Sequence, residues 1–157
     1  MTESTTFDVP PGRPDMTMTR RFAAAPSRVF EAHVDPAQIV RWWGPRRLTT
    51  VVHALEARPG GRWHFVQRGA DGVTHSFFGF FHTVEPGVAL VQTFEYEGAA
   101  GHVLASRLEF EPDGDGTLLR TTTVFFSVDE RDAMVASGME EGVVEGGERL
   151  DELLAEG

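Results

Sequence analysis

Seven stretches of the chain have the pattern of apolar and polar positions that is typical of β-strands. Turn sequences separate most of these strands. They include Pro59–Gly60, Asp71–Gly72, Glu85–Pro86–Gly87 and "PDGDG". The last six strands therefore form one succession linked by hairpins, and Gly79 is a candidate bulge within the fourth strand. The predicted strands cover residues 16–22, 48–56, 62–68, 73–85, 88–97, 102–111 and 117–126.

Two short helices are predicted between the first two strands. Pro26 suits the first position of a helix, and positions 29, 30 and 33 then recur at helical spacing. Asp35–Pro36 is a second start signal, an N-cap residue followed by proline. Gly44–Pro45 is expected to end that second helix.

The C-terminal region is expected to be helical, with Asp129 as a candidate cap. Positions 139, 143, 146, 150 and 153 fall on one helical face and carry Met, Val, Gly, Leu and Leu. This helix is the only predicted element large enough to cover one face of a sheet.

The predicted order is therefore β-α-α-β6-α, an α+β fold. A mostly antiparallel sheet with one polar face must cover its other face. A curved seven-stranded sheet wrapped around the long C-terminal helix leaves a cavity between the two. Residues 16–157 are predicted to form this single domain, after a disordered N-terminal tail of residues 1–15.

Strand alternation assigns a mainly aromatic and uncharged set of side chains to the inner face. A bulge at Gly79 would leave open which face of the fourth strand points inward, and Ser76, Phe78 and Phe80 are the favoured inward set. The last strand presents Leu119, Thr121, Thr123 and Phe125 on one face. Of the adjacent tryptophans, Trp43 is expected in the core and Trp42 at the mouth of the cavity. The candidate ligand-binding residues are Trp42, Trp63, Phe65, Gln67, Ser76, Phe78, Phe80, Phe94, Tyr96, Ser106, Leu108, Phe110, Thr121, Met139 and Val143.

Composition narrows the function classes. The chain has no Cys, and all 14 basic residues are Arg, so thiolate and lysine Schiff-base chemistry are excluded. The net charge of −10 argues against nucleic acid or an anionic membrane as a partner. The first 15 residues do not have the pattern of a signal peptide, so a cytoplasmic location is expected. The absence of both Lys and Asn indicates a GC-rich, bacterial genome.

The motifs of common catalytic and cofactor sites are missing. The 6 His are scattered, with no metal-ligand spacing, and no glycine-rich loop joins a strand to a helix. No Ser lies in a nucleophile elbow. No metal or other cofactor is expected, and His75, His82 and Tyr96 are the only candidates for proton transfer in the cavity.

Several segments resemble the stand-alone bacterial proteins similar to the activator of heat shock protein 90 ATPase, in the START-like (SRPBCC, birch-pollen-allergen-like) superfamily. They are "APSRVFEAHVDPAQIVRWWGP", "RPGGRWHF", "GFFHTVEP" before "LVQTFEY", "GTLLRTTT" and "SGMEEG". The resemblance spans about residues 16–155 and implies a helix-grip fold. It does not specify the function, because related proteins have many functions.

The last helix departs from the family pattern, in which a Trp often follows the first Gly. Here Val143 follows Gly142, and Gly146 and Gly147 come soon after. Two interpretations stay open. The glycines indicate a kink or an indifferent composition, or they enlarge the cavity or allow close backbone contact with the sheet.

Three functions are weighed for this chain. The leading hypothesis is binding of a hydrophobic or aromatic small molecule in the cavity by a monomer or homodimer, without catalysis. The alternative is a cyclase- or hydrolase-like enzyme that uses a cavity His and Tyr96. The third, implied by the family name, is a chaperone ATPase-stimulating interaction; it ranks last because only about fifteen residues precede the first strand. The charged helix 139–157 is interpreted as a solvated face, with a basic partner protein as the alternative.

Overall fold

The computed structural model describes residues 4–156 and confirms an α+β fold built on one curved antiparallel sheet. Within these residues the sheet has eight strands in the order β1-β2-β8-β7-β6-β5-β4-β3. The strands are β1 Thr6–Asp8, β2 Asp15–Phe22, β3 Thr49–Leu55, β4 Arg62–Arg68, β5 Thr74–Glu85, β6 Ala89–Tyr96, β7 Leu104–Asp113 and β8 Gly116–Val124.

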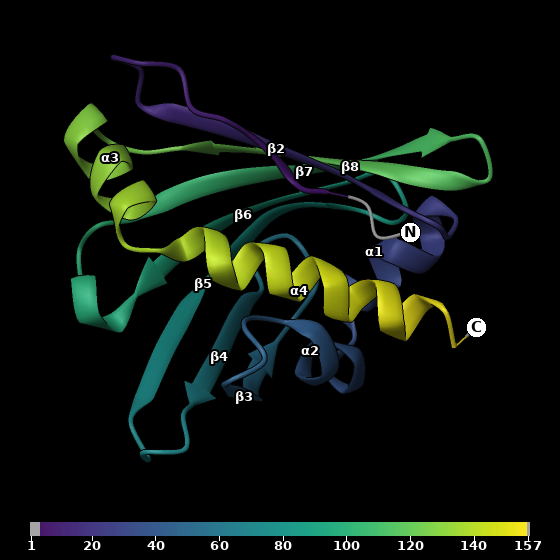
Figure 1. Cartoon of the computed structure of the whole chain (residues 1–157), viewed down its shortest axis with the longest axis horizontal. Coiled ribbons are helices and arrows are strands. Elements are labelled where there is room, and N and C mark those ends of the chain that lie inside the picture. The colour runs from purple at the N-terminus through teal and green to yellow at the C-terminus, as the bar shows by residue number, and fades with distance from the viewer. Residues whose placement is uncertain (1–3, 157) are drawn as a thin grey trace.

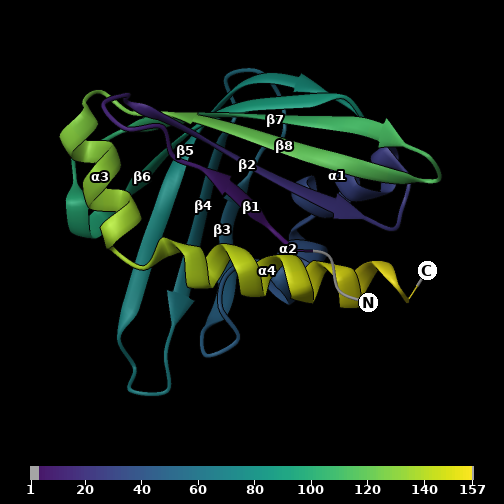
Figure 2. The same ribbon diagram turned by 45° about the horizontal axis from the view of Figure 1, so that its top comes forward.

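Four α-helices in the described part of the chain accompany the sheet. They are α1 Pro26–Val34, α2 Pro36–Trp42, α3 Val128–Ala136 and α4 Met139–Leu154, and a 3-10 turn, η1, spans Glu97–Ala99. Figures 1 and 2 show the sheet bending around one side of α4. Helices α1 and α2 lie toward the C-terminal end of α4, and α3 lies at its N-terminal end.

The predicted helix start signals are confirmed at α1 and α2. Pro26 and Pro36 open the two helices, and the Asp35 carboxylate accepts a hydrogen bond from the Ala37 backbone N–H at 3.0 Å. This bond satisfies one of the N–H groups that lack a partner in the first turn of a helix. Helix α2 ends at Trp42, and Gly44 adopts a left-handed φ of 92° just beyond it.

The sequence prediction missed strand β1 and thus counted seven strands. Thr6–Asp8 lies within the segment assigned to an N-terminal tail, and it pairs antiparallel with β2. The buried side chain of Arg131 helps to hold this end of the chain, because its guanidinium donates to the backbone carbonyls of Pro10 and Asp15. A long-range bond of this kind leaves no local signal in the sequence.

The C-terminal region forms two helices, not one. Ser127 caps α3, accepting a hydrogen bond from the Glu130 N–H at 3.1 Å, so the choice of Asp129 was wrong by two residues. Gly138 then separates α3 from α4 with a φ of 85°, a conformation that favours glycine. The predicted face of α4 is confirmed, since Leu150 and Leu153 are buried in the core and Met139 and Val143 are half-buried.

Gly79 does not form the predicted bulge. The register of β5 against β6 shifts between Phe81 and Thr83, so His82 is the extra residue. Gly79 instead lies under the Trp63 indole, whose Nε1–H donates to the Thr93 carbonyl at 3.0 Å. A Cβ on Gly79 would be 2.1 Å from that carbonyl oxygen, so only glycine leaves room for this contact across three strands.

The first half of β5 alternates without interruption, and its orientation is the opposite of the expected one. In the observed register Phe65 pairs with Phe77, and Gln67 pairs with His75. His75, Phe77, Gly79 and Phe81 therefore face α4. Ser76, Phe78 and Phe80, which were expected to point inward, lie on the outer face of the sheet, where the Phe80 side chain is 60% exposed.

The core lies where α1 and α2 meet the sheet. It contains Val29, Phe30, Ile39, Trp63, Phe65, Phe110, Leu150 and Leu153, all buried. His33 of α1 packs on the rings of Trp42 and Phe110, at centroid distances of 4.8 and 5.3 Å. The His33 Nδ1–H donates to the Val29 carbonyl at 2.8 Å. Burial lowers the pKa of His33 to about 4, although this hydrogen bond opposes the shift.

We predict that His33 makes the fold less stable as the pH falls from about 6.5 to about 4. The unfolded chain binds a proton here near the ordinary pKa of 6.5, whereas the folded chain resists protonation down to about 4. The contribution of His33 to the free energy of unfolding is complete above pH 6.5, and it falls by about 2–3 kcal/mol as the pH is lowered toward 4.

The measurement is the free energy of unfolding in urea at several pH values. His33→Gln keeps a donor for the Val29 carbonyl and removes the titration, so its curve should be flatter between pH 4 and 6.5. His82→Gln, at an exposed position, is the matched control. Equal slopes for the wild type and His33→Gln would contradict the prediction.

Candidate functional site

Six aromatic side chains form a continuous surface on the face of the sheet that α4 covers. Trp43 contacts Phe65 and Phe77 edge-on, at centroid distances of 5.1 and 5.3 Å. Phe77 in turn stacks on Tyr96 at 5.1 Å and lies 5.6 Å from Phe94. The aromatic wall, as this surface is called below, consists of Trp43, Trp63, Phe65, Phe77, Phe94 and Tyr96.

Strand pairing builds this wall. Phe65, Phe77 and Tyr96 occupy one row across β4, β5 and β6, because Phe77 pairs with both of the others. Directly opposed aromatic residues on one face of a sheet attract each other beyond their simple burial. Trp43 reaches the row from the end of α2, where its carbonyl accepts hydrogen bonds from Thr50 Oγ1 and Gln67 Nε2.

Exposure varies along the wall. Trp63 and Phe65 are buried, at 2% and 5% of their surface, whereas Trp43, Phe77, Phe94 and Tyr96 are only half-buried. The α4 residues at this end, Met139 and Val143, are half-buried as well. Further half-buried side chains that face α4 are Met18, Gln92, Ser106, Leu108 and Thr121. The N-terminal half of α4 therefore leaves the sheet partly open to solvent.

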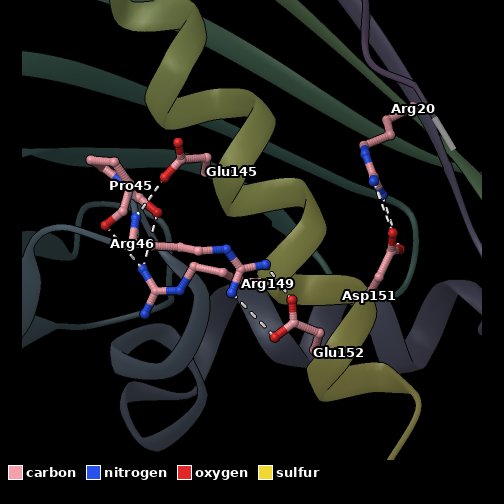
Figure 3. Close-up of polar contacts among 8 residues, drawn as sticks. Arg20, Pro45, Arg46, Glu145, Arg149, Asp151 and Glu152 are labelled. Atoms are coloured by element: carbon pink, nitrogen blue, oxygen red, sulfur yellow. Dashed lines mark hydrogen bonds and ion pairs between the residues drawn. The ribbon is translucent and has the colours of Figure 1, made fainter. Parts of the chain in front are cut away.

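The C-terminal half of α4 is firmly attached to the sheet. The Arg20 guanidinium, only 6% exposed, makes two hydrogen bonds to the Asp151 carboxylate, at 2.8 and 2.9 Å. It also lies 4.9 Å above the ring of Phe22. A buried guanidinium is stable only when it is paired, so this bond fixes the position of α4 relative to β2. Figure 3 shows Arg20 approaching α4 from the side opposite to Arg46 and Arg149.

On that opposite side, α4 holds the loop between α2 and β3. Arg149 donates to the Gly44 carbonyl at 3.0 Å, and Glu145 accepts from the Arg46 backbone N–H at 2.8 Å (Figure 3). Glu152 forms an ion pair with the Arg46 side chain, and this hydrogen bond lowers the pKa of the Glu152 carboxyl group. Farther along the helix, Arg47 pairs with Glu141 and Arg41 with Glu156. Much of the acidic surface of α4 is thus paired within the chain.

The glycines of α4 allow close packing. A Cβ on Gly147 would lie 2.7 Å from Arg20 Nε, and one on Gly146 would lie 3.4 Å from the Trp42 carbonyl oxygen. Of the interpretations left open in the sequence, this geometry favours close contact at both positions, rather than cavity enlargement or an indifferent composition. Gly142 is less constrained, since its nearest neighbour would be Pro45 Cδ at 3.4 Å.

A cleft of about 330 Å³ extends the aromatic wall toward the β4–β5 hairpin. His75 belongs to its lining and connects it to the wall, because the His75 and Tyr96 ring centroids lie 6.0 Å apart. The hairpin cleft, as it is called below, is lined by Arg47, Leu48, Gly69, Ala70, Asp71, Val73 and His75. None of the candidate ligand-binding residues from the sequence lines it.

His75 and Tyr96 are hydrogen-bonded to each other, with 2.8 Å between His75 Nδ1 and the Tyr96 hydroxyl oxygen. The structure thus joins the two residues that the enzymatic alternative requires. His82, the other histidine candidate, is exposed, and its Nδ1 lies 2.8 Å from Thr83 Oγ1.

The structure distributes the predicted site residues over several environments. Phe94, Tyr96, Ser106, Leu108, Thr121, Met139 and Val143 lie around the partly open region. Trp63, Phe65, Gln67 and Phe110 face α4 but are buried. Ser76, Phe78 and Phe80 lie on the outer face, where Ser76 Oγ contacts His64 Nε2 at 2.5 Å.

The structure does not separate the two tryptophans as expected, since both are half-buried and pack against the same core cluster. Trp42 packs on His33 of α1, and its Nε1–H donates to the Ala32 carbonyl at 2.9 Å. Trp43 belongs to the partly accessible wall. Helical spacing alone could not assign them, because both residues are large and apolar and they are adjacent.

Sequence reasoning did not assign Met18, Arg20, Trp43, Phe77 or Gln92 to this region. Phe77 was missed because both faces of the alternating segment "SFFGFF" are apolar, so alternation alone does not show which face points inward. Arg20 carries no signal either, since "RR" at positions 20 and 21 offers one arginine to each face.

Two negative findings concern residues 4–156. No group of three or more His, Asp or Glu side chains is placed to hold a metal ion in this part of the chain. None of the helices formed by these residues combines the length and apolar character needed to cross a bilayer.

The chain is similar to one family and to several solved structures. The family model described as "Activator of Hsp90 ATPase homolog 1-like protein" matches residues 23–155. A protein from Rhodobacter sphaeroides is 27% identical, with a TM-score of 0.89 over 97% of this chain and 98% of that one. A protein from Arthrobacter aurescens is 26% identical, with a TM-score of 0.87 over 97% and 92%.

The AHSA1 protein from Silicibacter pomeroyi is 25% identical, with a TM-score of 0.75 over 90% of this chain and 97% of that one. No curated protein matches the sequence.

We predict opposite effects for two glycine-to-alanine substitutions within α4. Gly142→Ala should raise the free energy of unfolding by up to about 1 kcal/mol, because alanine favours the helix. Gly147→Ala should lower it by about 1–3 kcal/mol, because the new methyl group overlaps the fixed Arg20 side chain.

Urea unfolding of both variants measures this difference, and each variant is the control for the other. If the two substitutions change stability in the same direction, the proposed packing of Arg20 against α4 is wrong.

Proposed function

The chain belongs to the activator of Hsp90 ATPase homolog 1-like family, and on that premise we propose that it binds a hydrophobic or aromatic small molecule between the sheet and the N-terminal half of α4. The observation that carries the proposal is the half-buried state of Trp43, Phe77, Phe94 and Tyr96. Phenylalanine side chains such as Phe77 and Phe94 are usually buried more completely when they serve only packing. Here they lie in mutual contact on a face that a helix covers.

The surroundings suit an organic ligand. Such sites are mostly apolar and carry a few polar groups that fix the orientation of the ligand. Around the aromatic wall these groups are Gln92, Ser106, Thr121 and the His75–Tyr96 pair. The hairpin cleft adds about 330 Å³, which is within the usual range of ligand pockets.

A pair of adjacent valines in α4 offers a matched test. Val143 is half-buried on the face of α4 that carries Met139 and Leu150, whereas Val144 is 37% exposed. We predict that Val143→Trp fills the space over the wall and weakens binding of a neutral apolar probe by at least tenfold. Val144→Trp should change the affinity less than twofold.

The probe is N-phenyl-1-naphthylamine, whose fluorescence rises in apolar surroundings, titrated with each protein after circular dichroism has confirmed folding. Unchanged affinity in Val143→Trp would contradict the proposed location. Failure of the wild type to bind any apolar aromatic probe would contradict ligand binding itself.

A second candidate function is a cyclase- or hydrolase-like reaction at the same place. The hydrogen bond between His75 and Tyr96 favours it, because proton transfer needs a titratable group held by a partner. The third hypothesis, interaction with a chaperone, stays a prediction from the family name.

The hydrolase form of the second candidate predicts slow cleavage of apolar p-nitrophenyl esters. His75→Gln and Tyr96→Phe should both lower the rate, and His82→Gln should not. Release of p-nitrophenol, followed by absorbance, measures this rate. Equal rates in all four proteins would exclude a catalytic role for the pair in ester hydrolysis.

A further inference from the structure

The free nitrogen of His75 is the starting point. Its Nδ1 is engaged with the Tyr96 hydroxyl group at 2.8 Å. Its Nε2 has no hydrogen-bond partner within residues 4–156, and it is not among the buried polar atoms that lack one. Because His75 lines the hairpin cleft, this nitrogen remains accessible to a molecule that enters the cleft.

The pair can adapt to its ligand. If the Tyr96 hydroxyl group donates a hydrogen bond to Nδ1, then Nε2 of the neutral imidazole carries the hydrogen and donates a hydrogen bond to the ligand. If Nδ1 carries the hydrogen and Tyr96 accepts it, then Nε2 becomes an acceptor. A hydroxyl group both donates and accepts, so it satisfies His75 in either tautomer.

The hairpin cleft is lined by one charged side chain of each sign, Arg47 and Asp71, and each has a partner within the chain. Arg47 Nε lies 3.2 Å from Glu141 Oε1, and Asp71 Oδ1 accepts from the Val73 N–H at 2.9 Å. Of the charged side chains that line the hairpin cleft, Asp71 would repel an anionic ligand and Arg47 would repel a cationic one. A neutral group meets neither penalty.

The side-chain amide of Gln67, which lies near His75, is not available to a ligand. Gln67 pairs with His75 across the strands, but it is buried, and its Nε2–H donates to the Trp43 carbonyl at 3.3 Å. Among the described residues that line the hairpin cleft, His75 is therefore the uncharged polar side chain.

We propose that the His75–Tyr96 pair selects ligands that carry a neutral hydroxyl group, a phenol or an alcohol, over anionic or purely hydrocarbon ligands of the same shape. His75 contacts the hydroxyl group, and Tyr96 positions the imidazole ring. The inference rests on the proposed function, because the apolar body of the ligand lies on the aromatic wall.

Three ligands of one shape test the selection: 2-naphthol, naphthalene and 2-naphthoate. Their dissociation constants are obtained by displacement of N-phenyl-1-naphthylamine at pH 7, where 2-naphthol is neutral and 2-naphthoate is anionic. The selectivity is the ratio of the naphthalene constant to the 2-naphthol constant. The difference in hydration between the two compounds is the same for every variant, so it cancels when the selectivities of two variants are compared.

His75→Leu should lower the selectivity about fivefold, the effect of one hydrogen bond. Tyr96→Phe, which keeps the ring, should lower it at least twofold, because the imidazole loses its positioning partner. His82→Leu, at the exposed bulge, should leave the selectivity unchanged.

In the wild type, 2-naphthoate should bind more weakly than 2-naphthol, and Asp71→Asn should reduce that difference in affinity.

The outcomes separate the two proposals. If naphthalene and 2-naphthol both bind, and neither His75→Leu nor Tyr96→Phe alters the selectivity, the role of the pair is wrong and the ligand site stands. If 2-naphthoate binds as tightly as 2-naphthol, selection for a neutral group is wrong. If none of the three compounds displaces the probe, or no probe binds, the proposed function fails as well. Should His75→Leu not fold, Tyr96→Phe alone decides the result.

Discussion

The bond between Arg20 and Asp151 is the constraint on which the position of α4 depends. Arg20 lies on the inner face of the sheet, where a charged group is costly unless it is compensated. Asp151 compensates it from the C-terminal half of α4, and Gly147 leaves the space that the guanidinium needs. With the burial of Leu150, Leu153 and Leu154, this bond attaches one half of the helix to the sheet.

The other half of α4 is attached differently, and this asymmetry creates the candidate site. Here the helix carries Met139 and Val143, both half-buried, and it begins at the left-handed Gly138. The paired charge nearest to this end is the exposed contact between Arg47 and Glu141. Exposure along the aromatic wall follows the same direction, from buried Trp63 to half-buried Phe77 and Tyr96. The polar pair of His75 and Tyr96 stands where the wall meets the hairpin cleft.

Much of this fold could be predicted from the sequence, because its signals are local. Proline at the start of α1 and α2, the turn residues between strands and the helical spacing in α4 each act within a few residues. The missed elements depend on distant partners. Strand β1 needs β2 and Arg131, and Gly79 is explained only by the Trp63 indole that crosses it.

The candidate site was harder to predict, for a related reason. In "SFFGFF" and "RWW" large apolar residues are adjacent, so both faces of the element are equally hydrophobic and the pattern does not distinguish them. Only the register against β4 and β6 places Phe77 inward and Phe78 outward. Phe94 and Tyr96 of the predicted aromatic lining face α4, but the buried Arg20 on the same face of the sheet was not foreseen.

The central claim is that an apolar molecule occupies the space between the sheet and the N-terminal half of α4. Methyl NMR of the methionines, recorded during a titration with naphthalene, tests it directly. Met139 lies beside this space, whereas Met16 is buried at 1% exposure against Phe125. The account predicts a saturable shift of the Met139 methyl resonance, caused by the naphthalene ring current, and a smaller shift of the Met16 resonance, because Met16 is buried in the cluster against which Met139 packs. A Met139 resonance that does not move up to the solubility limit of naphthalene would contradict it.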